Sequence, residues 1–368
     1  MRRAPLRLLM TADAVGGVWQ YALDLAAGLG PYGVQTTLAV LGPSCSAEQR
    51  AEAKAVEGLS VVETGLPLDW LADAAAQVIE AGAQIAALAD RVGADLVQLN
   101  QPALAARAAF VMPVVVASHS CLLTWWDAVE GGIPPEDFAW RARLHMEGLQ
   151  AAQAVVCPSV AFATATQRAY GLAQPPRAVL NGRRVAAPPP AAMHDFAFTA
   201  GRLWDRGKDL AALDRAAARL GIPVKAAGSL KGPNGEQIDL AHVHAIGQVG
   251  ADAIAGCLAA RPVFVSTARY EPFGLAVLEA AAAGCALVLS DIPTFREIWG
   301  DAATFVAPGD DRGFAEAVTT FIGDTRLRLE LGERARDRAA RFTPARMAAD
   351  MASLYAALAQ PTPRRVAA

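Results

Sequence analysis

The sequence predicts an α/β protein of two domains, each built on a parallel sheet that is covered by helices on both faces. Three observations predict this class. Short apolar runs alternate with helical patterns, the runs are apolar throughout, and the alternation restarts after a proline cluster. Strands buried on both faces of a sheet lack the alternating polar positions of a solvated face. A chain of 368 residues is long enough for two such domains.

The first domain is expected to span residues 1–186. Its expected strands are Leu6–Thr11, Thr36–Leu41, Leu59–Thr64, Asp95–Leu99, Val114–Ser118, Ala154–Pro158 and Ala178–Asn181. After the first strand, Gly16 and Gly17 open a helix that runs through Leu29. A glycine pair between strand and helix lets the backbone approach a ligand closely, although an ordinary turn would also use it.

The second domain is expected to span residues 187–343, after a linker at Pro188–Pro190. Its expected strands are Phe196–Ala200, Val224–Gly228, Val243–Gly247, Val263–Thr267, Ala286–Ser290 and Thr304–Ala307. Two Rossmann-like halves of this kind place ligands outside the carboxyl ends of their strands. We therefore expect the two sheets to face a cleft between the domains.

Composition excludes several classes of protein. A net charge of −3 argues against a nucleic-acid binder, which is normally basic over at least one domain. The 5 cysteines are scattered and form no CxxC pair, which indicates buried thiols in a reducing cytoplasm. The uncharged stretch 108–126 is interrupted by Pro113 and His119, so it predicts a buried strand and a polar loop. The apolar run near the N-terminus is too short for a signal sequence.

The stretch Arg269–Gly284 carries the strongest functional pattern. An apolar strand, a tight turn at Pro272 and Gly274, and a helix together point backbone N–H groups at an anion. Glu271 lies in the turn and Glu279 lies on the helix. Carboxylates repel phosphate, so we expect them to accept hydrogen bonds from the hydroxyls of a sugar or ribose. A site that binds phosphate and hydroxyls together indicates a nucleotide sugar.

Glu271 and Glu279 are separated by seven residues and begin within Tyr-Glu-Pro-Phe-Gly, and LVLSDIPTFREIWGDAA follows them. This pattern resembles that of retaining GT-B glycosyltransferases of family 4, also called glycosyl transferases group 1. The resemblance implies transfer of a hexose from a nucleoside diphosphate sugar, with UDP or GDP as the nucleotide, to a hydroxyl of a saccharide, a lipid-linked or a small-molecule acceptor. It also implies that the last helix, 344–360, packs back on the first domain.

The resemblance assigns roles to further residues. Arg202 and Lys208 would neutralise the diphosphate, and His119 would hydrogen-bond the transferred hexose together with Glu271. Taken alone, the two cations would be solvated surface charges and the histidine a structural residue. The expected donor-binding residues are Gly16, Gly17, Gln248, Val249, Phe273, Gly274, Leu275 and Glu279. Among them, Gln248 and Val249 would contact the nucleobase.

The acceptor side has weaker signals. Trp125 and Trp126 follow His119 in an expected loop at the mouth of the cleft, where their indole faces would stack on a carbohydrate or pack between the domains. The stretch Phe138–Leu149 carries basic residues beside apolar ones. It indicates a helix that contacts a membrane surface from the cytoplasmic side.

No cofactor or metal is expected, because the sequence has no DxD motif in the site and Asp310-Asp311 is typical of a helix start. Two alternatives share the expected fold. One is a nucleotide-sugar 2-epimerase, and the other is a nucleotide-sugar sensor without catalysis, against which Arg202, Lys208 and Glu271 argue. A dehydrogenase is disfavoured, since no GxGxxG follows a strand.

Overall fold

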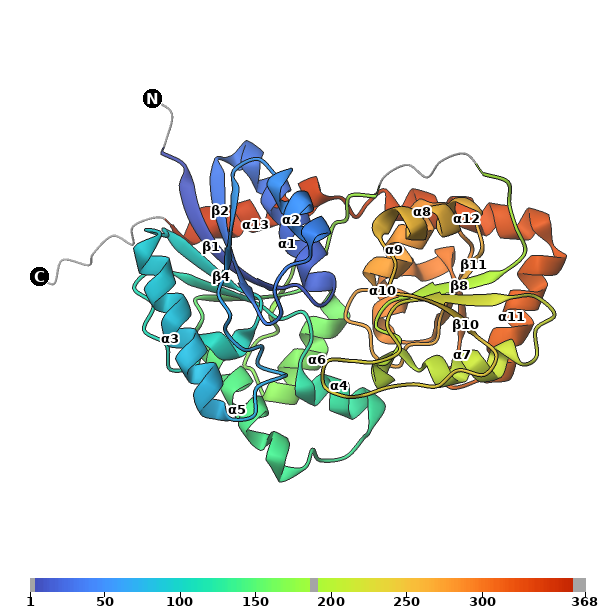
Figure 1. Ribbon diagram of the computed structural model, residues 1–368, viewed down its shortest axis with the longest axis horizontal. Helices are drawn as coiled ribbons and strands as arrows, with labels where there is room; N and C mark the ends of the chain where they lie inside the picture. Colours follow the sequence, from blue (N-terminus) through green and yellow to red (C-terminus); the bar gives the residue numbers. More distant parts are fainter. Residues whose placement is uncertain (1–3, 186–190, 360–368) are drawn as a thin grey trace, which may run out of the picture.

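Two parallel sheets lie side by side along the long axis of the molecule (Figure 1). The computed structural model describes residues 4–185 and 191–359. The first sheet consists of β1 (Leu6–Asp13), β2 (Val34–Leu41), β3 (Leu59–Glu63), β4 (Leu96–Leu99), β5 (Val114–Ala117), β6 (Ala154–Cys157) and β7 (Arg177–Ala178). Its order is β3-β2-β1-β4-β5-β6-β7. In a doubly wound sheet of this order, a crevice opens at the strand ends where the order reverses, between β1 and β4.

The second sheet repeats this plan. It consists of β8 (Ala197–Ala200), β9 (Val224–Ala227), β10 (His244–Gly247), β11 (Val263–Ser266), β12 (Leu287–Ser290) and β13 (Thr304–Val306). Its order is β10-β9-β8-β11-β12-β13, so the reversal falls between β8 and β11. The segments that follow these two strands carry Arg202 and Glu271, and the topology therefore brings both residues to one crevice.

The predicted fold class is confirmed: all thirteen expected strands occur, in two parallel sheets. The reason for the continuous apolar runs is visible along β1, where Leu8 and Met10 belong to one core and Leu9 to the core on the opposite face. Bounds differ by a few residues. The largest difference is β7, a two-residue edge strand at Arg177–Ala178 instead of Ala178–Asn181.

Helices cover both faces of each sheet. Those of the first domain are α1 (Gly17–Leu29), α2 (Ala47–Lys54), α3 (Ala75–Arg91), α4 (Leu122–Val129), α5 (Glu136–Ala151) and α6 (Val160–Tyr170). After the linker come α7 (Leu210–Ala217), α8 (Ala251–Ala259), α9 (Leu275–Ala282), α10 (Pro293–Trp299), α11 (Asp311–Gly323), α12 (Thr325–Ala339) and α13 (Pro344–Leu358). None of the helices in the described ranges is both long and apolar enough to cross a bilayer. The linker expected at 188–190 lies outside the described residues.

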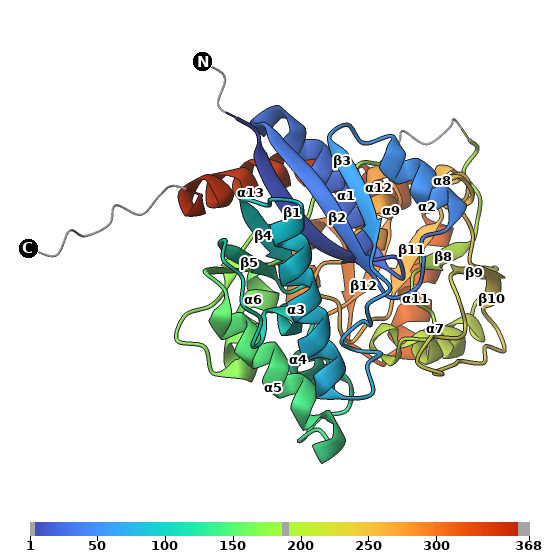
Figure 2. The ribbon, with the colours of Figure 1, turned by 60° about the vertical axis from the view of Figure 1, so that its left-hand side comes forward.

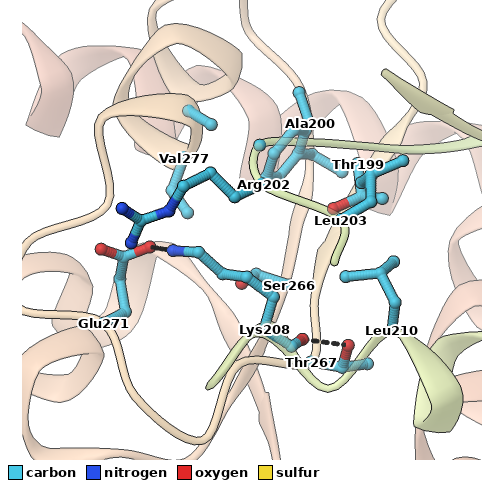
Figure 3. Close-up of a pocket in the computed structure, with 13 residues that line it drawn as sticks. Thr199, Ala200, Arg202, Leu203, Lys208, Leu210, Ser266, Thr267, Glu271 and Val277 are labelled. Atoms are coloured by element: carbon cyan, nitrogen blue, oxygen red, sulfur yellow. Dashed lines mark hydrogen bonds and ion pairs between the residues drawn. The ribbon is translucent and has the colours of Figure 1, made fainter. Parts of the chain in front are cut away.

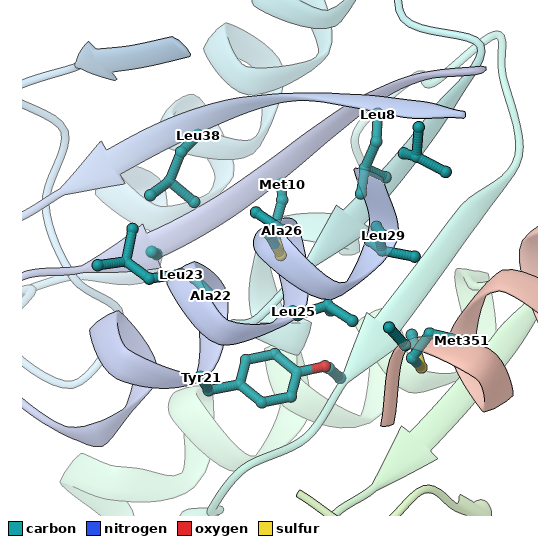
Figure 4. Close-up of a cluster of buried hydrophobic side chains, with 14 of the residues drawn as sticks. Leu8, Met10, Tyr21, Ala22, Leu23, Leu25, Ala26, Leu29, Leu38 and Met351 are labelled. Carbon is teal, nitrogen blue, oxygen red and sulfur yellow. The ribbon is translucent and has the colours of Figure 1, made fainter. Parts of the chain in front are cut away.

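The last helix, α13, returns to the first domain and lies beside α1 (Figures 1 and 2). Its buried side chains join the core built by β1, α1 and β2 (Figure 4). They are Met347, Ala348, Met351 and Tyr355. The two helices approach closely at Gly28, where an added Cβ would lie 2.7 Å from the Cβ of Ala348. A larger residue at this position would separate α1 from α13.

Tyr355 also connects α13 to the end of the first sheet. Its hydroxyl donates to the side-chain oxygen of Gln98, and the Gln98 amide donates to Asn100 Oδ1 at 2.9 Å. The same Asn100 oxygen lies 3.1 Å from His119 Nε2. A buried chain of hydrogen bonds therefore runs from the C-terminal helix to the histidine that the sequence places in the site.

We expect α13 to be part of the stability of the first domain. Met351 is fully buried, so Met351→Ala should lower the free energy of unfolding by about 2–5 kcal/mol. Ser353→Ala, at an exposed position of the same helix, is the matched control and should change it by less than about 0.5 kcal/mol. Chemical denaturation followed by circular dichroism measures both. A chain cut before Pro344 that unfolds like the intact protein would contradict the role of α13.

Candidate active site

The expected catalytic residues lie where the carboxyl ends of the two sheets meet. Arg202 follows β8, Glu271 follows β11, and Lys208 ends a short 3-10 helix, Arg206–Lys208. His119 follows β5 in the first domain. Because parallel strands end at one edge, segments distant in sequence converge here. The structure thus brings Arg202, Lys208 and Glu271 together in one pocket, and His119 lies at the carboxyl end of a strand of the first sheet.

Lys208 and Glu271 form an ion pair between their side chains, which are 20% and 17% exposed. The guanidinium of Arg202 points toward the same carboxylate (Figure 3). Thr267 supports the lysine segment, since its hydroxyl donates to the Lys208 carbonyl at 3.1 Å. Two cations and one carboxylate at a sheet edge provide positive charge for an anion and an acceptor for a hydroxyl.

Asp205 holds the Arg202–Lys208 loop in place. Its carboxylate accepts from Arg202 at 3.0 Å and from the backbone N–H of Gly207 at 2.9 Å. Burial alone would raise the pKa of this carboxyl, but the charges of Arg202 and Lys208 and the Gly207 hydrogen bond outweigh it, so the pKa lies below its usual value. The carboxylate is therefore charged at neutral pH and fixes the direction of Arg202.

His119 is uncharged at neutral pH, since burial lowers its pKa to about 4. Asn100 donates through Nδ2 to the Thr11 carbonyl at 2.6 Å, which leaves its oxygen facing His119 Nε2. Nε2 must then carry the proton, and Nδ1 has the free lone pair. This ring packs edge-on against Tyr21, and its Nδ1 is able to accept a hydrogen bond without supplying a charge.

Gly16 and Gly17 face the second domain. A Cβ built on Gly16 would lie 3.8 Å from an Arg202 guanidinium nitrogen, and one on Gly17 would lie 3.3 Å from Leu275 Cδ1. The turn is held by Asp13, whose carboxylate accepts from the N–H groups of Val15 and Gly16. The glycines thus allow the start of α1 to approach the site from across the cleft.

The turn before α9 provides backbone groups, but Phe273 does not present its side chain to the site. Gly274 is the N-cap of α9 and has a φ of 96°, which favours glycine. The Phe273 ring is 3% exposed and packs edge-to-face on Phe342, with ring centroids 5.8 Å apart. A role for Phe273 as a donor-binding residue is therefore restricted to its backbone. Leu275 begins the helix and is half-buried.

Glu279 takes part in an interaction that the sequence did not indicate. Arg183 donates to Glu279 at 2.7 Å and to Asp24 of α1 at 3.0 Å. The side chains of Arg183, Asp24 and Glu279 are 15%, 5% and 22% exposed. Arg183 follows Asn181-Gly182, just before the proline cluster, and nothing in that local pattern identifies two acids so distant in sequence.

Gln248 and Val249 were predicted to contact the nucleobase. They follow β10, which is the edge strand of the second sheet, and Gln248 is exposed. They are not among the residues around Arg202, Lys208 and Glu271 that line the pocket of Figure 3. Their contact with a nucleobase stays a prediction.

The expected loop with Trp125 and Trp126 is wrong, because both residues lie in α4. Trp125 Nε1 donates to Asp205 of the second domain at 3.2 Å, so the indole packs between the domains. Trp126 donates to the Gly131 carbonyl and packs on Phe138. The helix places the two indoles in different surroundings, Trp125 against the second domain and Trp126 against α5.

Two further contacts also join the domains. The Glu297 carboxylate accepts from the N–H groups of Val160 and Ala161, at the start of α6. The Tyr270 hydroxyl accepts from the Cys121 N–H at 3.1 Å and bonds the Thr124 hydroxyl at 2.9 Å. A carboxylate at a helix N-terminus accepts hydrogen bonds from the free N–H groups there and interacts favourably with the helix dipole. These bonds fix the second domain against α4 and α6.

Within residues 4–185 and 191–359, histidine, cysteine and carboxylate side chains form no group of three or more suited to a metal ion. The predicted membrane-surface helix is α5. Two of its basic residues do not face outward: His145 is buried, and Arg141 donates to the Ala72 carbonyl at 2.7 Å. A membrane contact stays a prediction.

Comparison with known proteins identifies the class. The family model described as Glycosyltransferase Family 4 matches residues 15–186, and the model described as Glycosyl transferases group 1 matches residues 236–338. The chain belongs to this family of glycosyltransferases. The two matches fall on the first and second sheets, so the family stated from Glu271 and Glu279 is confirmed. Transfer with retention stays a prediction.

Solved structures confirm the GT-B fold. Sucrose-phosphate synthase from Thermosynechococcus elongatus superposes with a TM-score of 0.78 at 18% identity, over 96% of this chain and 99% of that one. HepE from Anabaena, in complex with UDP-glucose, gives a TM-score of 0.72 at 20% identity, over 96% and 100%. At these identities the likeness shows the fold alone.

Curated relatives match over shorter segments. Phosphatidyl-myo-inositol mannosyltransferase of Mycolicibacterium smegmatis is 33% identical over 121 residues, which are 32% of this chain and 31% of that protein. Glycogen synthase of Mycobacterium tuberculosis is 42% identical over 76 residues, 20% of this chain and 18% of that protein. The chain thus matches less than a third of the length of these relatives.

Arg183 should stabilise the closed arrangement of the domains. Arg183→Met removes the cation that lies 3.0 Å from buried Asp24 and leaves only the Arg184 guanidinium at 4.0 Å, so it should cost up to about 3–5 kcal/mol. Arg50→Met, which breaks the exposed Arg50–Glu63 pair, is the matched control and should cost at most about 1 kcal/mol. Chemical denaturation of both variants measures the difference. Equal, small losses would show that the Arg183 interactions contribute no stability.

Proposed function

We propose that the protein transfers a hexose from a nucleoside diphosphate sugar to a hydroxyl acceptor, with retention of the anomeric configuration and without a metal. The observation that carries this proposal is the Lys208–Glu271 pair beside Arg202, at the reversal point of the second sheet. Cations for a diphosphate and a carboxylate for sugar hydroxyls lie side by side there. An uncharged His119 lies on the facing domain.

UDP is the first nucleotide to test. The solved neighbour HepE is described in complexes with UDP, with UDP and glucose, and with UDP-glucose. A melting-temperature screen of UDP, GDP and ADP sugars tests the donor class. Liquid chromatography of donor incubated without acceptor tests for epimerisation, and a new sugar nucleotide formed there would replace transfer as the function.

Each residue has a defined task in the proposed reaction. The acceptor oxygen forms a bond to the anomeric carbon on the face from which the diphosphate departs, and the bond between that carbon and the phosphate oxygen breaks. The acceptor proton passes to the departing phosphate, so no side chain acts as the base. Arg202 and Lys208 stabilise the growing phosphate charge, while Glu271 and His119 Nδ1 accept hydrogen bonds from the hexose.

Substitution of Glu271 and of Glu279 should affect different steps, the first the transfer of the hexose and the second the binding of the nucleotide. Glu271→Ala should lower transfer by at least about 100-fold and leave nucleoside diphosphate affinity within a few-fold, because Glu271 contacts the hexose. Glu279→Ala should weaken that affinity itself, because Glu279 would bind the ribose. The fold should tolerate the latter change, since Arg183 keeps its bond to Asp24. Calorimetric titration decides, and equal losses of affinity would contradict these assignments.

Transfer should not require a divalent metal. The leaving diphosphate carries about two to three negative charges, which enzymes hold with Mg²⁺ or with fixed cations. Transfer should therefore survive excess EDTA, whereas Lys208→Ala should lower the rate by at least about 100-fold with or without Mg²⁺. Lys54→Ala, at an exposed position of α2, is the control. Loss of activity in EDTA and recovery with Mg²⁺ would overturn the roles of Arg202 and Lys208.

A further inference from the structure

A cavity of about 470 Å³ opens between the domains beside the donor site. Five of the 7 tryptophans of the chain line it: Trp70, Trp125, Trp126, Trp140 and Trp204. All five are half-buried. The other two, Trp19 and Trp299, are 1% and 0% exposed in the hydrophobic cores. Core packing therefore does not account for the tryptophans of the cavity.

The rings come from both domains. Trp70 precedes α3 in the first domain and stacks on Trp204 of the second, with ring centroids 6.4 Å apart and planes 24° apart. Trp126 packs on Phe138, and Arg141 lies over the Trp140 ring at 4.4 Å. Closure of the two domains thus assembles the aromatic lining, and separating them would divide it.

Polar groups lie among the rings. Four carboxylates and three guanidinium groups line the cavity: Asp69, Glu130, Asp205, Glu236, Arg141, Arg202 and Arg206. Arg202 pairs with Asp205 and Arg206 pairs with Glu130, so two of the three cations are neutralised within the cavity. The third, Arg141, lies near Asp69, and burial raises the pKa of that carboxyl to about 6. Glu236 is the fourth carboxylate, so the lining has no excess of cations, and this disfavours an anionic ligand.

The cavity adjoins the candidate donor site. Arg202 lines both this cavity and the pocket that holds Lys208 and Glu271. Ser120 and Tyr270 line it as well, and they are the chain neighbours of His119 and Glu271. A ligand in the cavity would therefore have one end next to the hexose to be transferred.

We propose that this cavity binds the acceptor and that the acceptor is a neutral saccharide. The inference rests on the proposed function for its donor. A pyranose ring has a face of C–H groups, which packs on an indole, and a rim of hydroxyls, which carboxylate, amide and guanidinium groups bind. A lipid chain would need aliphatic lining, and Leu122 and Leu144 are few among these rings. An aromatic molecule with few hydroxyls would leave Asp69 and Glu236 with fewer hydrogen-bond donors than a saccharide provides.

Binding without any donor tests the site. Maltose, cellobiose, sucrose and α-1,6-mannobiose are titrated into the full chain, with tryptophan emission and saturation-transfer NMR as readouts. Naringenin and decyl dimethylamine oxide represent the flat aromatic and the lipid-like ligand. At least one disaccharide should shift the emission and show transfer to its C–H protons. Binding of none of the four, or of only the two other probes, overturns the saccharide assignment.

Variants separate ring stacking from general packing. Trp204→Leu should weaken disaccharide binding by about 10-fold or more, and Trp204→Phe, which keeps a ring, should recover most of it. Tyr32→Ala is the control: it removes an exposed aromatic ring of the 3-10 helix Gly30–Tyr32, which does not line the cavity. It should leave the disaccharide affinity unchanged. Equal affinities of the Leu and Phe variants would refute stacking on Trp204. The melting temperature verifies that each variant is folded.

Titration of UDP and GDP into the same samples keeps the two proposals apart. Disaccharide binding without affinity for either nucleotide would leave the cavity assignment standing and remove the proposed donor. Nucleotide binding and donor hydrolysis without disaccharide binding would leave the proposed donor standing and overturn the assignment of the cavity.

Discussion

The arrangement of the two domains depends on Arg183. This residue lies at the end of the first domain, and its guanidinium joins Asp24 on α1 to Glu279 on α9. Buried ion pairs recover little net stability, because removing charges from water costs as much as their attraction returns. Their effect is geometric: Asp24 is 5% exposed, and the guanidinium groups of Arg183 and Arg184 both lie within 4.0 Å of its carboxylate. The start of the linker, the first helix and the donor helix are thereby fixed to one another.

Several consequences follow from this fixed geometry. The same helix α1 presents Gly16 to Arg202 at its start and packs on α13 at Gly28. On the other side of the cleft, Glu297 binds the start of α6 and Tyr270 binds the start of α4. Each bond joins a loop or helix of the second sheet to a helix start of the first domain. The carboxyl ends of the two sheets therefore face one another with little freedom to shift.

The sequence predicted the strands well because each strand records its environment locally: residues buried on both faces are apolar without interruption. Glu271 and Lys208 were also predictable, since each follows a recognisable strand. Arg183, Tyr355 and Trp70 were not. Each of these residues acts through partners that are distant in sequence. The pattern of residues around a position does not show which distant residues it will contact.

The pairing of Lys208 with Glu271 bears on how a carboxylate can stand beside a diphosphate. An isolated Glu271 would repel the donor, whereas a Glu271 bonded to Lys208 presents a nearly neutral pair, beside Arg202. Arg202 is in turn compensated by Asp205, which is buried and charged. The two carboxylates thus hold the cations in position before the donor arrives. They also cancel the positive charge of Arg202 and Lys208, so the empty site has little net charge. A donor that brings its own negative charge would redistribute these bonds, and Lys208 would then be shared between Glu271 and phosphate. Under the proposed reaction, the binding of the leaving phosphate by Lys208 would then depend on where Glu271 holds the hexose.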